Sequence, residues 1–213
     1  MSIEYLESLK TIFWDFDGVI KDSEEVKSDA FAQLFSHFGV SVCDRIRRHH
    51  ESNGGVSRYE KIPLYLSWVG KEQSSSNIHL YSDKFSEIVK QAVIDSPWVP
   101  GAKEFLEKYY DRKIFILVTG TPQQEIEQII NALNIRHCFY RVYGTPSKKA
   151  DSIKISIDEF NINPKESIMI GDSKSDCESA KTNKVPFMLR RTKLNRELQA
   201  QLSCQMFDDF ICE

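Results

Sequence analysis

Two pairs of aspartates follow two separate apolar stretches of the chain. Asp15 and Asp17 end the first stretch, and Asp172 and Asp176 come directly after the second. Carboxylates held this close repel each other unless a divalent cation binds between them or one of them is protonated. Both arrangements are typical of catalytic sites, where carboxylates bind metals or act as general acids. The four aspartates are therefore candidates for such a site.

The position of each pair relative to its apolar stretch predicts that the carboxylates meet. Side chains alternate along a β-strand, so Asp15 and Asp17 point to one side, and Asp176 lies one helical turn after Asp172. Open α/β sheets bind ligands at the carboxyl ends of parallel strands. Ligands that offer only oxygen, without a nearby His or Cys, favour Mg²⁺ over Zn²⁺. The plainer alternatives are a solvated strand-to-turn junction for the first pair and a helix N-cap for Asp172 and Ser173.

Two other segments have features of a phosphate-binding site. The run Thr119–Pro122 places a hydroxyl and free backbone N–H groups where a helix is predicted to begin, and helix N-termini attract phosphate. Lys148 and Lys149 open another predicted helix, where the helix dipole repels cations and a bound phosphate would offset that repulsion. Taken singly, these segments are also explained by simple capping and by two solvated lysines.

The chain alternates short apolar segments with amphipathic ones, which predicts an α/β fold with a Rossmann-like parallel sheet and helices on both faces. Five segments rich in β-branched and aromatic residues are the expected strands: 11–16, 113–119, 139–143, 167–170 and 186–189. One helix is expected from Pro122 to about Leu133, with Thr121 as its N-cap, and another from Lys149 to Phe160.

The segment between the first two expected strands is too long for a crossover, and it carries helical rather than strand patterns. We therefore expect an inserted helical domain at 22–96, with the core domain formed by 1–21 and 97–213. Within the insertion, Ser74–Asn77 predicts a flexible turn between two helices.

The composition restricts the classes of function. The 213 residues are 41% hydrophobic and 28% charged, with a formal net charge of −3. This gives no overall attraction for nucleic acid, and the basic run Arg45–His50 is expected to be a solvated helix face. No segment is apolar enough to cross a bilayer, and the first residues lack a signal-peptide pattern, so we expect a cytoplasmic protein. The five scattered cysteines predict reduced thiols.

Taken together, four motifs occur in an order that resembles the haloacid dehalogenase-like superfamily across the whole chain. They are Asp-Phe-Asp-Gly-Val at 15–19, Thr-Gly-Thr at 119–121, a lysine at 148 or 149, and Gly-Asp-Ser-Lys-Ser-Asp at 171–176. Each motif is weak alone, whereas four in this order across an α/β pattern are specific. The resemblance implies the α/β core already expected from the sequence pattern, with an inserted small helical cap domain.

The resemblance implies a role for each aspartate. Asp15 would attack phosphorus and form an aspartyl phosphate, while Asp17 would protonate the leaving oxygen and then deprotonate the attacking water. Mg²⁺ would bind the Asp15 carboxylate, the Asp17 backbone carbonyl and Asp172. Asp176 would assist directly or through a water molecule. Dehalogenases of the superfamily lack an acid at the position of Asp17, so the resemblance favours a phosphatase.

The resemblance also implies a phosphoryl-binding set. Thr119 and Gly120 would hold the transferring phosphoryl group, and a lysine would offset its charge. The lysine motif of the superfamily usually has a proline close after the lysine, whereas Pro146 precedes both lysines here. Lys149 fits the motif better by its spacing along the predicted helix, and Lys148 stays an alternative.

The helical insertion resembles the cap domain of the phosphoglycolate phosphatase and β-phosphoglucomutase branch. Asp22-Ser23-Glu24 resembles the segment that leads into that cap, and Gly54–Lys61 resembles the cap loop that closes over the active site. This makes Asp22, Arg58 and Lys61 candidate substrate-binding residues, with Arg58 and Lys61 suited to an anionic or hydroxylated distal group. The alternative for the two basic residues is a solvated helix face, since they lie three positions apart.

These features predict a Mg²⁺-dependent phosphatase that hydrolyses a small phosphorylated metabolite, for example a sugar phosphate, through Asp15. Two alternatives stay open. The segment Gly-Val-Ser-Arg-Tyr-Glu at 55–60 also resembles the cap loop of a phosphomutase of the β-phosphoglucomutase type. The chain could instead be a non-catalytic binding or regulatory module on the same fold. We expect a monomer or a homodimer, without a nucleic-acid or membrane partner.

Overall fold

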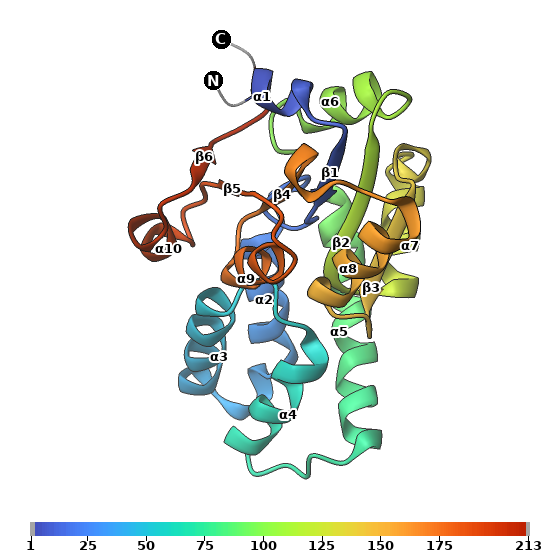
Figure 1. Ribbon diagram of the computed structural model, residues 1–213. Coiled ribbons are helices and arrows are strands. Elements are labelled where there is room, and N and C mark those ends of the chain that lie inside the picture. Colours follow the sequence, from blue (N-terminus) through green and yellow to red (C-terminus); the bar gives the residue numbers. More distant parts are fainter. Residues whose placement is uncertain (1–2, 212–213) are drawn as a thin grey trace.

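A six-stranded sheet lies at the centre of the computed structural model, which describes residues 3–211 (Figure 1). Its strands are β1 (Thr11–Trp14), β2 (Ile114–Pro122), β3 (Arg141–Thr145), β4 (Ser167–Gly171), β5 (Phe187–Arg190) and β6 (Gln205–Phe207). The order is β3-β2-β1-β4-β5-β6, and every neighbouring pair is parallel. The carboxyl ends of β2, β1 and β4 therefore lie side by side at one edge of the sheet.

Helices cover both faces of this sheet because its central strands are apolar on both sides. Trp14 and Ile170 face a cluster with α1 (Ile3–Ser8), α6 (Ala102–Tyr109) and α7 (Gln123–Ala132). Phe13 and Met169 point the other way and pack against α8 (Lys149–Phe160) and α9 (Lys174–Thr182). A short helix, α10 (Arg196–Gln201), connects β5 to β6. The predicted α/β fold with helices on both faces is confirmed.

The helices between β1 and β2 form a separate lobe below the sheet in Figure 1. They are α2 (Glu24–Leu34), α3 (Val40–Ser52), α4 (Arg58–Trp68) and α5 (Ser75–Asp95). An aromatic cluster stabilises the lobe, in which the Phe31 ring centroid lies 4.0 Å from that of Phe85 and 5.4 Å from that of Tyr65. The helical insertion is confirmed, whereas its limits at residues 22 and 96 stay a prediction.

The two linkers of the insertion leave and rejoin the core side by side. Lys21 and Trp98 form an antiparallel bridge, and the Asp22 N–H donates to the Pro97 carbonyl at 2.9 Å. The Lys21 ammonium lies 4.7 Å from the centroid of the Trp98 ring and donates to the Ile94 carbonyl at 3.0 Å. The base of the insertion is therefore a short two-stranded contact.

The helix after β2 begins later than expected. Its first residue is Gln123, because β2 continues through Pro122 and pairs there with Thr145 of β3. The expectation that Thr121 is the N-cap was wrong, since Thr121 belongs to the strand. The helix at 149–160 has the expected bounds.

Two further differences concern short segments. Ser74 is the N-cap of α5 and accepts a hydrogen bond from the Asn77 N–H at 3.4 Å, so residues 75–77 form a helical turn rather than the expected flexible one. The edge strand β6 was not expected, because its three residues are too few to show an alternating pattern.

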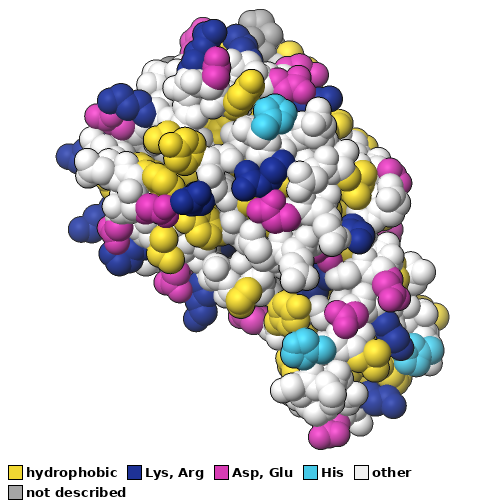
Figure 2. All heavy atoms as spheres, turned by 90° about the vertical axis from the view of Figure 1, so that its right-hand side faces the viewer, with side chains coloured by type: hydrophobic (Ala, Val, Ile, Leu, Met, Phe, Trp, Pro, Cys, Tyr) yellow, Lys and Arg dark blue, Asp and Glu magenta, His cyan; other side chains and the backbone are white. Residues whose placement is uncertain are grey.

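Within residues 3–211, no helix combines the length and the apolarity that a bilayer crossing requires. Basic and acidic side chains are interspersed on the face shown in Figure 2, where the insertion is the narrower lobe at the lower right.

In the basic run at 45–50, Arg45 lies over the Trp68 ring at 3.9 Å, whereas His50 is half-buried against Phe31. The expectation of a solvated helix face was therefore wrong for His50. The free thiols in the described chain are Cys43, Cys138, Cys177 and Cys204, and Cys212 lies outside the described residues.

Candidate active site

Three aspartates meet where β1 and β4 end. Asp15 directly follows β1, and Asp172 and Asp176 follow β4. One carboxylate oxygen from each residue lies within 4.8 Å of the others, and all three side chains are buried. The two strands are adjacent and parallel, and this pairing brings together carboxylates that are distant in the sequence. The expected convergence at the sheet edge is therefore present for Asp15, Asp172 and Asp176.

Lys149, the first residue of α8, contacts two of these aspartates. Its Nζ lies 2.9 Å from Asp15 Oδ2 and donates to Asp176 Oδ1 at 2.6 Å. Burial would lower the pKa of Lys149, but the charges of Asp15 and Asp176 outweigh burial and raise it. Lys148 is the exposed N-cap of the same helix. Of the two candidate lysines, the structure brings Lys149 to the aspartates.

The N-terminus of α9 positions Asp176. The N–H and Oγ of Ser173 both donate to Asp176 Oδ2, at 3.2 Å and 2.5 Å, as part of a capping box. Ser173 is therefore the N-cap of α9 and also the residue that holds the Asp176 carboxylate in place. The backbone of Gly18 lies close to the Asp172 carboxylate. Its φ is +70°, a conformation that favours glycine, and a Cβ there would lie 2.8 Å from Cγ of Asp172. A side chain at Gly18 would displace that carboxylate.

The aspartates are strongly perturbed by their surroundings. Burial, followed by the charge of Asp176, raises the pKa of Asp15 to about 8, although Lys149 acts in the opposite direction. Burial and the adjacent Glu24 raise the pKa of Asp172 well above its usual range. A divalent cation among these oxygens would favour the ionised forms. The buried, oxygen-only set therefore fits a hard cation of the Mg²⁺ type.

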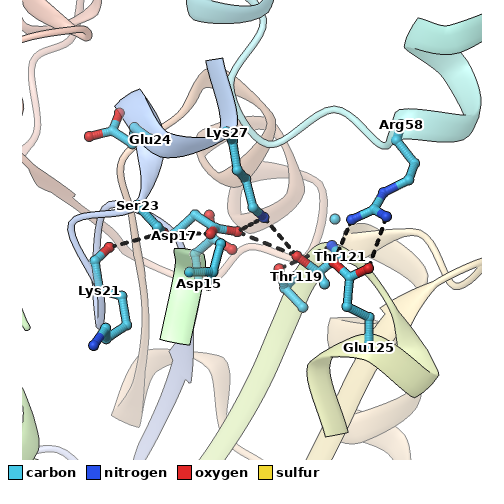
Figure 3. Close-up of polar contacts among 12 residues, drawn as sticks. Asp15, Asp17, Lys21, Ser23, Glu24, Lys27, Arg58, Thr119, Thr121 and Glu125 are labelled. Atoms are coloured by element: carbon cyan, nitrogen blue, oxygen red, sulfur yellow. Dashed lines mark hydrogen bonds and ion pairs between the residues drawn. The ribbon is translucent and has the colours of Figure 1, made fainter. Parts of the chain in front are cut away.

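Asp17 is held by side chains at the start of the insertion (Figure 3). Ser23 Oγ donates to Asp17 Oδ1 at 2.6 Å, and the Lys27 ammonium pairs with Asp17 Oδ2. Lys27 also donates to Thr121 Oγ1 at 2.9 Å, which connects α2 to the end of β2. Burial would raise the pKa of Asp17, but Lys27 and Ser23 outweigh burial and lower it. Lys27 was not among the residues predicted from the sequence.

Thr119 and Gly120 lie beneath the loop that precedes α4. Thr119 is buried, and its Oγ1 accepts from the Thr121 N–H at 3.2 Å. A Cβ on Gly120 would lie 2.8 Å from the carbonyl oxygen of Gly55, so this core segment and the loop of the insertion touch. The loop at 54–57 thus lies against the site.

Arg58 and Lys61 are buried rather than exposed on a helix face. Arg58 donates to both carboxylate oxygens of Glu125 on α7, at 2.9 Å and 2.5 Å, as Figure 3 shows. Ser86 Oγ donates to the same carboxylate at 2.5 Å, and the guanidinium lies 4.4 Å from the centroid of the Phe85 ring. Arg58 therefore connects the insertion to the core, and its charge is matched by Glu125.

Removal of Glu125 is expected to destabilise the protein. In Glu125→Gln the buried Arg58 loses its counter-ion, and breaking such a pair costs about 3–5 kcal/mol. Urea unfolding would measure this loss, with Glu159→Gln as the matched control, because the exposed Arg141–Glu159 pair is expected to contribute about 1 kcal/mol or less. The double variant Arg58→Met with Glu125→Leu should recover most of the stability, and an equally unstable double variant would contradict this account.

Asp22, the third candidate substrate-binding residue of the insertion, lies apart from Arg58 and Lys61. Its carboxylate pairs with Arg190 at the end of β5, and Arg190 also donates to the Gly18 carbonyl at 3.1 Å and the Asp208 carbonyl at 3.0 Å. Asp22 thus fixes the first linker to the sheet. The structure does not bring it to the other candidate substrate-binding residues.

A cavity of about 70 Å³ lies between the core and the insertion. Core and insertion residues both line it, among them Asp15, Asp17, Thr119, Gly120, Asp172, Lys27, His50, Arg58 and Lys61. Side chains of the core and of the insertion therefore face one shared space.

The fold and the site together define a class of enzyme, in which an aspartate and lysine cluster at the ends of parallel strands lies under an inserted helical lobe. Residues 12–189 match the family model of the haloacid dehalogenase-like hydrolases. The match covers most of the chain, and the chain therefore belongs to this hydrolase family.

Two phosphatases are similar to this chain over most of their length. A phosphorylated carbohydrates phosphatase of Thermotoga maritima is 25% identical over 185 residues, which cover 82% of this chain and 81% of the relative. A phosphoglycolate phosphatase of Vibrio cholerae is 27% identical over 189 residues, which cover 83% of this chain and 81% of the relative.

Solved structures show the same fold. The crystal structure of CbbY from Rhodobacter sphaeroides in complex with xylulose-(1,5)bisphosphate aligns with a TM-score of 0.75 at 18% identity, over 95% of both chains. That of a putative phosphoglycolate phosphatase from Lactobacillus plantarum aligns with a TM-score of 0.73 at 14% identity, over 95% of this chain and 96% of that one. The shared architecture includes the insertion.

Proposed function

We propose that this chain is a Mg²⁺-dependent phosphatase that hydrolyses a small phosphorylated metabolite, with Asp15 as the nucleophile. The observation that supports it most is the contact of Lys149 with both Asp15 and Asp176 beside the cavity. It places a candidate nucleophile next to a fixed positive charge, and phosphoryl transfer depends mainly on positioning and on neutralisation of charge. The phosphatase names of the similar relatives support the same reaction class.

The reaction would proceed in two steps. An Asp15 carboxylate oxygen attacks phosphorus, the bond from phosphorus to the ester oxygen breaks, and a protonated Asp17 gives its proton to the leaving oxygen. A water oxygen then attacks the same phosphorus, Asp17 takes a proton from that water, and the bond to Asp15 breaks. Inorganic phosphate leaves, and both aspartates return to their starting states.

The surrounding residues would control the charges in these steps. Thr119 and Gly120 hold the phosphoryl group, and Lys149 offsets its charge. In the described state Lys27 favours an ionised Asp17, and the negative charge of a bound phosphoryl group acts against Lys27 and favours the protonated form. Mg²⁺ held by Asp15, Asp172 and the Asp17 carbonyl, with Asp176 nearby, would neutralise charge on the phosphoryl oxygens.

Added Mg²⁺ is expected to start phosphate release from p-nitrophenyl phosphate and also to stabilise the protein. A ligand at 100 times its dissociation constant contributes about 2.7 kcal/mol. For a protein of this size, that raises the melting temperature by about 5–10 °C. Differential scanning fluorimetry and a phosphate assay would measure both effects, and EDTA should reverse both. In Asp172→Asn the thermal shift should be lost, and an unchanged shift there would contradict the assigned site.

The acid role of Asp17 predicts a dependence on the leaving group. An alkoxide must be protonated as it leaves, whereas p-nitrophenolate needs little help, and general acid catalysis contributes about 10²–10⁴-fold. Asp17→Asn should therefore reduce kcat for an alkyl phosphate by a larger factor than kcat for p-nitrophenyl phosphate. Steady-state kinetics on both esters would test this. Equal losses would remove the evidence for proton donation.

The alternative functions have less support. The phosphomutase alternative rested on the cap-loop segment that contains Arg58, and that guanidinium is already occupied by Glu125. The non-catalytic alternative would leave the buried cluster of Asp15, Asp172 and Lys149 without a purpose, although such a cluster costs stability.

A further inference from the structure

The loop that follows β5 contacts the chain beside the candidate cation ligands at two points. Residues 191–195 form this loop, which connects β5 to α10. Asn195 Nδ2 donates to the Asp172 carbonyl at 2.7 Å, across 23 positions of the sequence. At the start of the loop, the Arg190 guanidinium donates to the Gly18 carbonyl at 3.1 Å. The end of β5 therefore holds both the turn that follows β1 and the residue that follows β4.

The side chain of Asn195 uses its full hydrogen-bonding capacity. Its Nδ2 also donates to the Arg190 carbonyl at 2.9 Å, and its Oδ1 accepts from the Thr192 N–H at 2.9 Å and from Gln199 Nε2 at 2.6 Å. A backbone N–H can only donate and a backbone carbonyl can only accept, so these partners fix which way the amide faces. The buried amide is thus held in one orientation, with a donor directed at Asp172.

A helix cap does not explain this residue. Asn195 occupies the N-cap position of α10, where an asparagine usually accepts from a backbone N–H in the first turn of the helix. Within the described chain, its side chain makes no such capping bond. The contact between Nδ2 and the Asp172 carbonyl, which lies outside α10, therefore needs another explanation.

Asp172 needs support because it lies between two regular elements. β4 ends at Gly171 and α9 begins at Lys174, so Asp172 belongs neither to the strand nor to the helix. Its carboxylate is nevertheless one of the three that meet at the sheet edge. Ligands of a metal must be held within about 0.5 Å of their working positions. A hydrogen bond to the Asp172 carbonyl fixes the backbone from which that carboxylate projects, and a neutral amide does so without adding charge.

We propose that Asn195 is a positioning residue for the cation site, because it holds the Asp172 carboxylate beside that of Asp15. The proposal rests on the proposed function, which supplies the cation. Thr192 supports Asn195, since its Oγ1 accepts from the Asn195 N–H at 3.2 Å. The same hydroxyl donates to Oε1 of Glu24, the first residue of α2, at 3.2 Å. The loop therefore also contacts the start of the insertion.

Asn195→Leu is expected to weaken Mg²⁺ binding by about 10- to 100-fold, as the loss of an outer partner of a metal ligand does. Leucine has the branching of asparagine and no charge, so the variant removes the hydrogen bonds without altering the charge near the site. Isothermal titration calorimetry with Mg²⁺ would measure the dissociation constant without any turnover. At saturating Mg²⁺, kcat should stay within about threefold of the wild type, because every ligand is retained.

Gln123 provides the matched control. Its side-chain amide also contacts the backbone of another segment, because Nε2 donates to the Val142 carbonyl at 3.1 Å and Oε1 accepts from the Gly144 N–H at 2.6 Å. These contacts connect α7 to β3, at the opposite edge of the sheet from β6. Gln123→Met likewise replaces an amide by an apolar side chain, and it should keep the Mg²⁺ dissociation constant within about twofold of the wild type.

Thr192→Val gives a second, milder test that also applies if Asn195→Leu does not fold. It keeps the Asn195 amide and removes the hydroxyl that supports it. The loss of one hydrogen bond predicts a rise of about 2- to 10-fold in the Mg²⁺ dissociation constant. If Asn195→Leu does not fold, an unchanged constant in Thr192→Val overturns the proposal.

The outcomes separate this proposal from the proposed function. A lower melting temperature of Asn195→Leu with an unchanged Mg²⁺ dissociation constant would assign the residue a purely structural role and overturn the proposal. An equal rise of the constant in Gln123→Met would do the same. In both cases the phosphatase function stands, provided that the wild type binds Mg²⁺ and releases phosphate. If the wild type does neither, the proposed function itself fails.

Discussion

Asp15→Asn is expected to reduce phosphate release from p-nitrophenyl phosphate by at least about 10⁴-fold, as expected when a nucleophile is removed. The amide cannot attack phosphorus, yet it has almost the shape of the carboxylate. The protein should fold, because Asn replaces a carboxyl group whose ionised form is disfavoured at this position: burial and the charge of Asp176 raise the pKa of Asp15 to about 8. Stopped assays with Mg²⁺, together with circular dichroism of both proteins, would measure the effect.

An exposed aspartate provides the matched control for this variant. Asp158 of α8 forms an exposed pair with Lys154, and Asp158→Asn should leave turnover within about twofold of the wild type, as expected for a surface substitution. Acid quenching during turnover, followed by peptide mass spectrometry, should find a phosphoryl group on the peptide that contains Asp15. A phosphoryl group on another residue, or normal turnover by Asp15→Asn, would contradict the assigned nucleophile.

Lys149→Met is expected to reduce kcat by about 10²–10³-fold, as the loss of one group that stabilises charge in a transition state does. The ammonium contacts both Asp15 and Asp176, so its removal also leaves two buried carboxylates uncompensated. Without Mg²⁺ this should cost about 3–5 kcal/mol of stability. With Mg²⁺ part of that loss should be recovered, because the cation supplies positive charge at the same place. Kinetics and urea unfolding, each with and without Mg²⁺, would measure these effects.

Lys148→Met is the control for this experiment, and it also separates the two lysines that the sequence left as alternatives. Lys148 is exposed, and its substitution should change kcat by less than about threefold. Comparable losses in Lys148→Met and Lys149→Met would mean that the lysine contact in the structure is not the one used in catalysis. Lys149→Arg should fold better than Lys149→Met, because the charge is retained.

The parallel sheet and the aspartates at its carboxyl edge were largely predictable, because both follow from local sequence patterns. Short apolar segments alternate with amphipathic ones, so the parallel strands could be placed, and the carboxyl-end rule then placed Asp15 beside Asp172 and Asp176. The spacing along the helix correctly favoured Lys149 over Lys148 as the lysine near the aspartates. β6 escaped prediction because three residues carry too little pattern.

The contacts between the insertion and the core were not predictable from the sequence. Lys27 reaches Asp17 only because a turn returns α2 over the end of β1, and no local pattern marks a lysine for such a contact. Arg58 carried a family-like motif, but its partner Glu125 is 67 positions away on α7. Asp22 likewise pairs with Arg190, 168 positions away. Such pairings depend on how the two lobes dock, which periodicity does not encode.

The bridge between Lys21 and Trp98 has a consequence for how this architecture can vary. Two antiparallel residues can be joined by a hairpin of two residues. The core therefore keeps the same strand order whether those two positions are joined by a tight turn or by a domain. Because the ends of the insertion are adjacent, a lobe of another size or shape can be exchanged at this junction without altering the pairing of β1 with β2. The sheet edge that carries the three aspartates and the inserted lobe can consequently diverge independently.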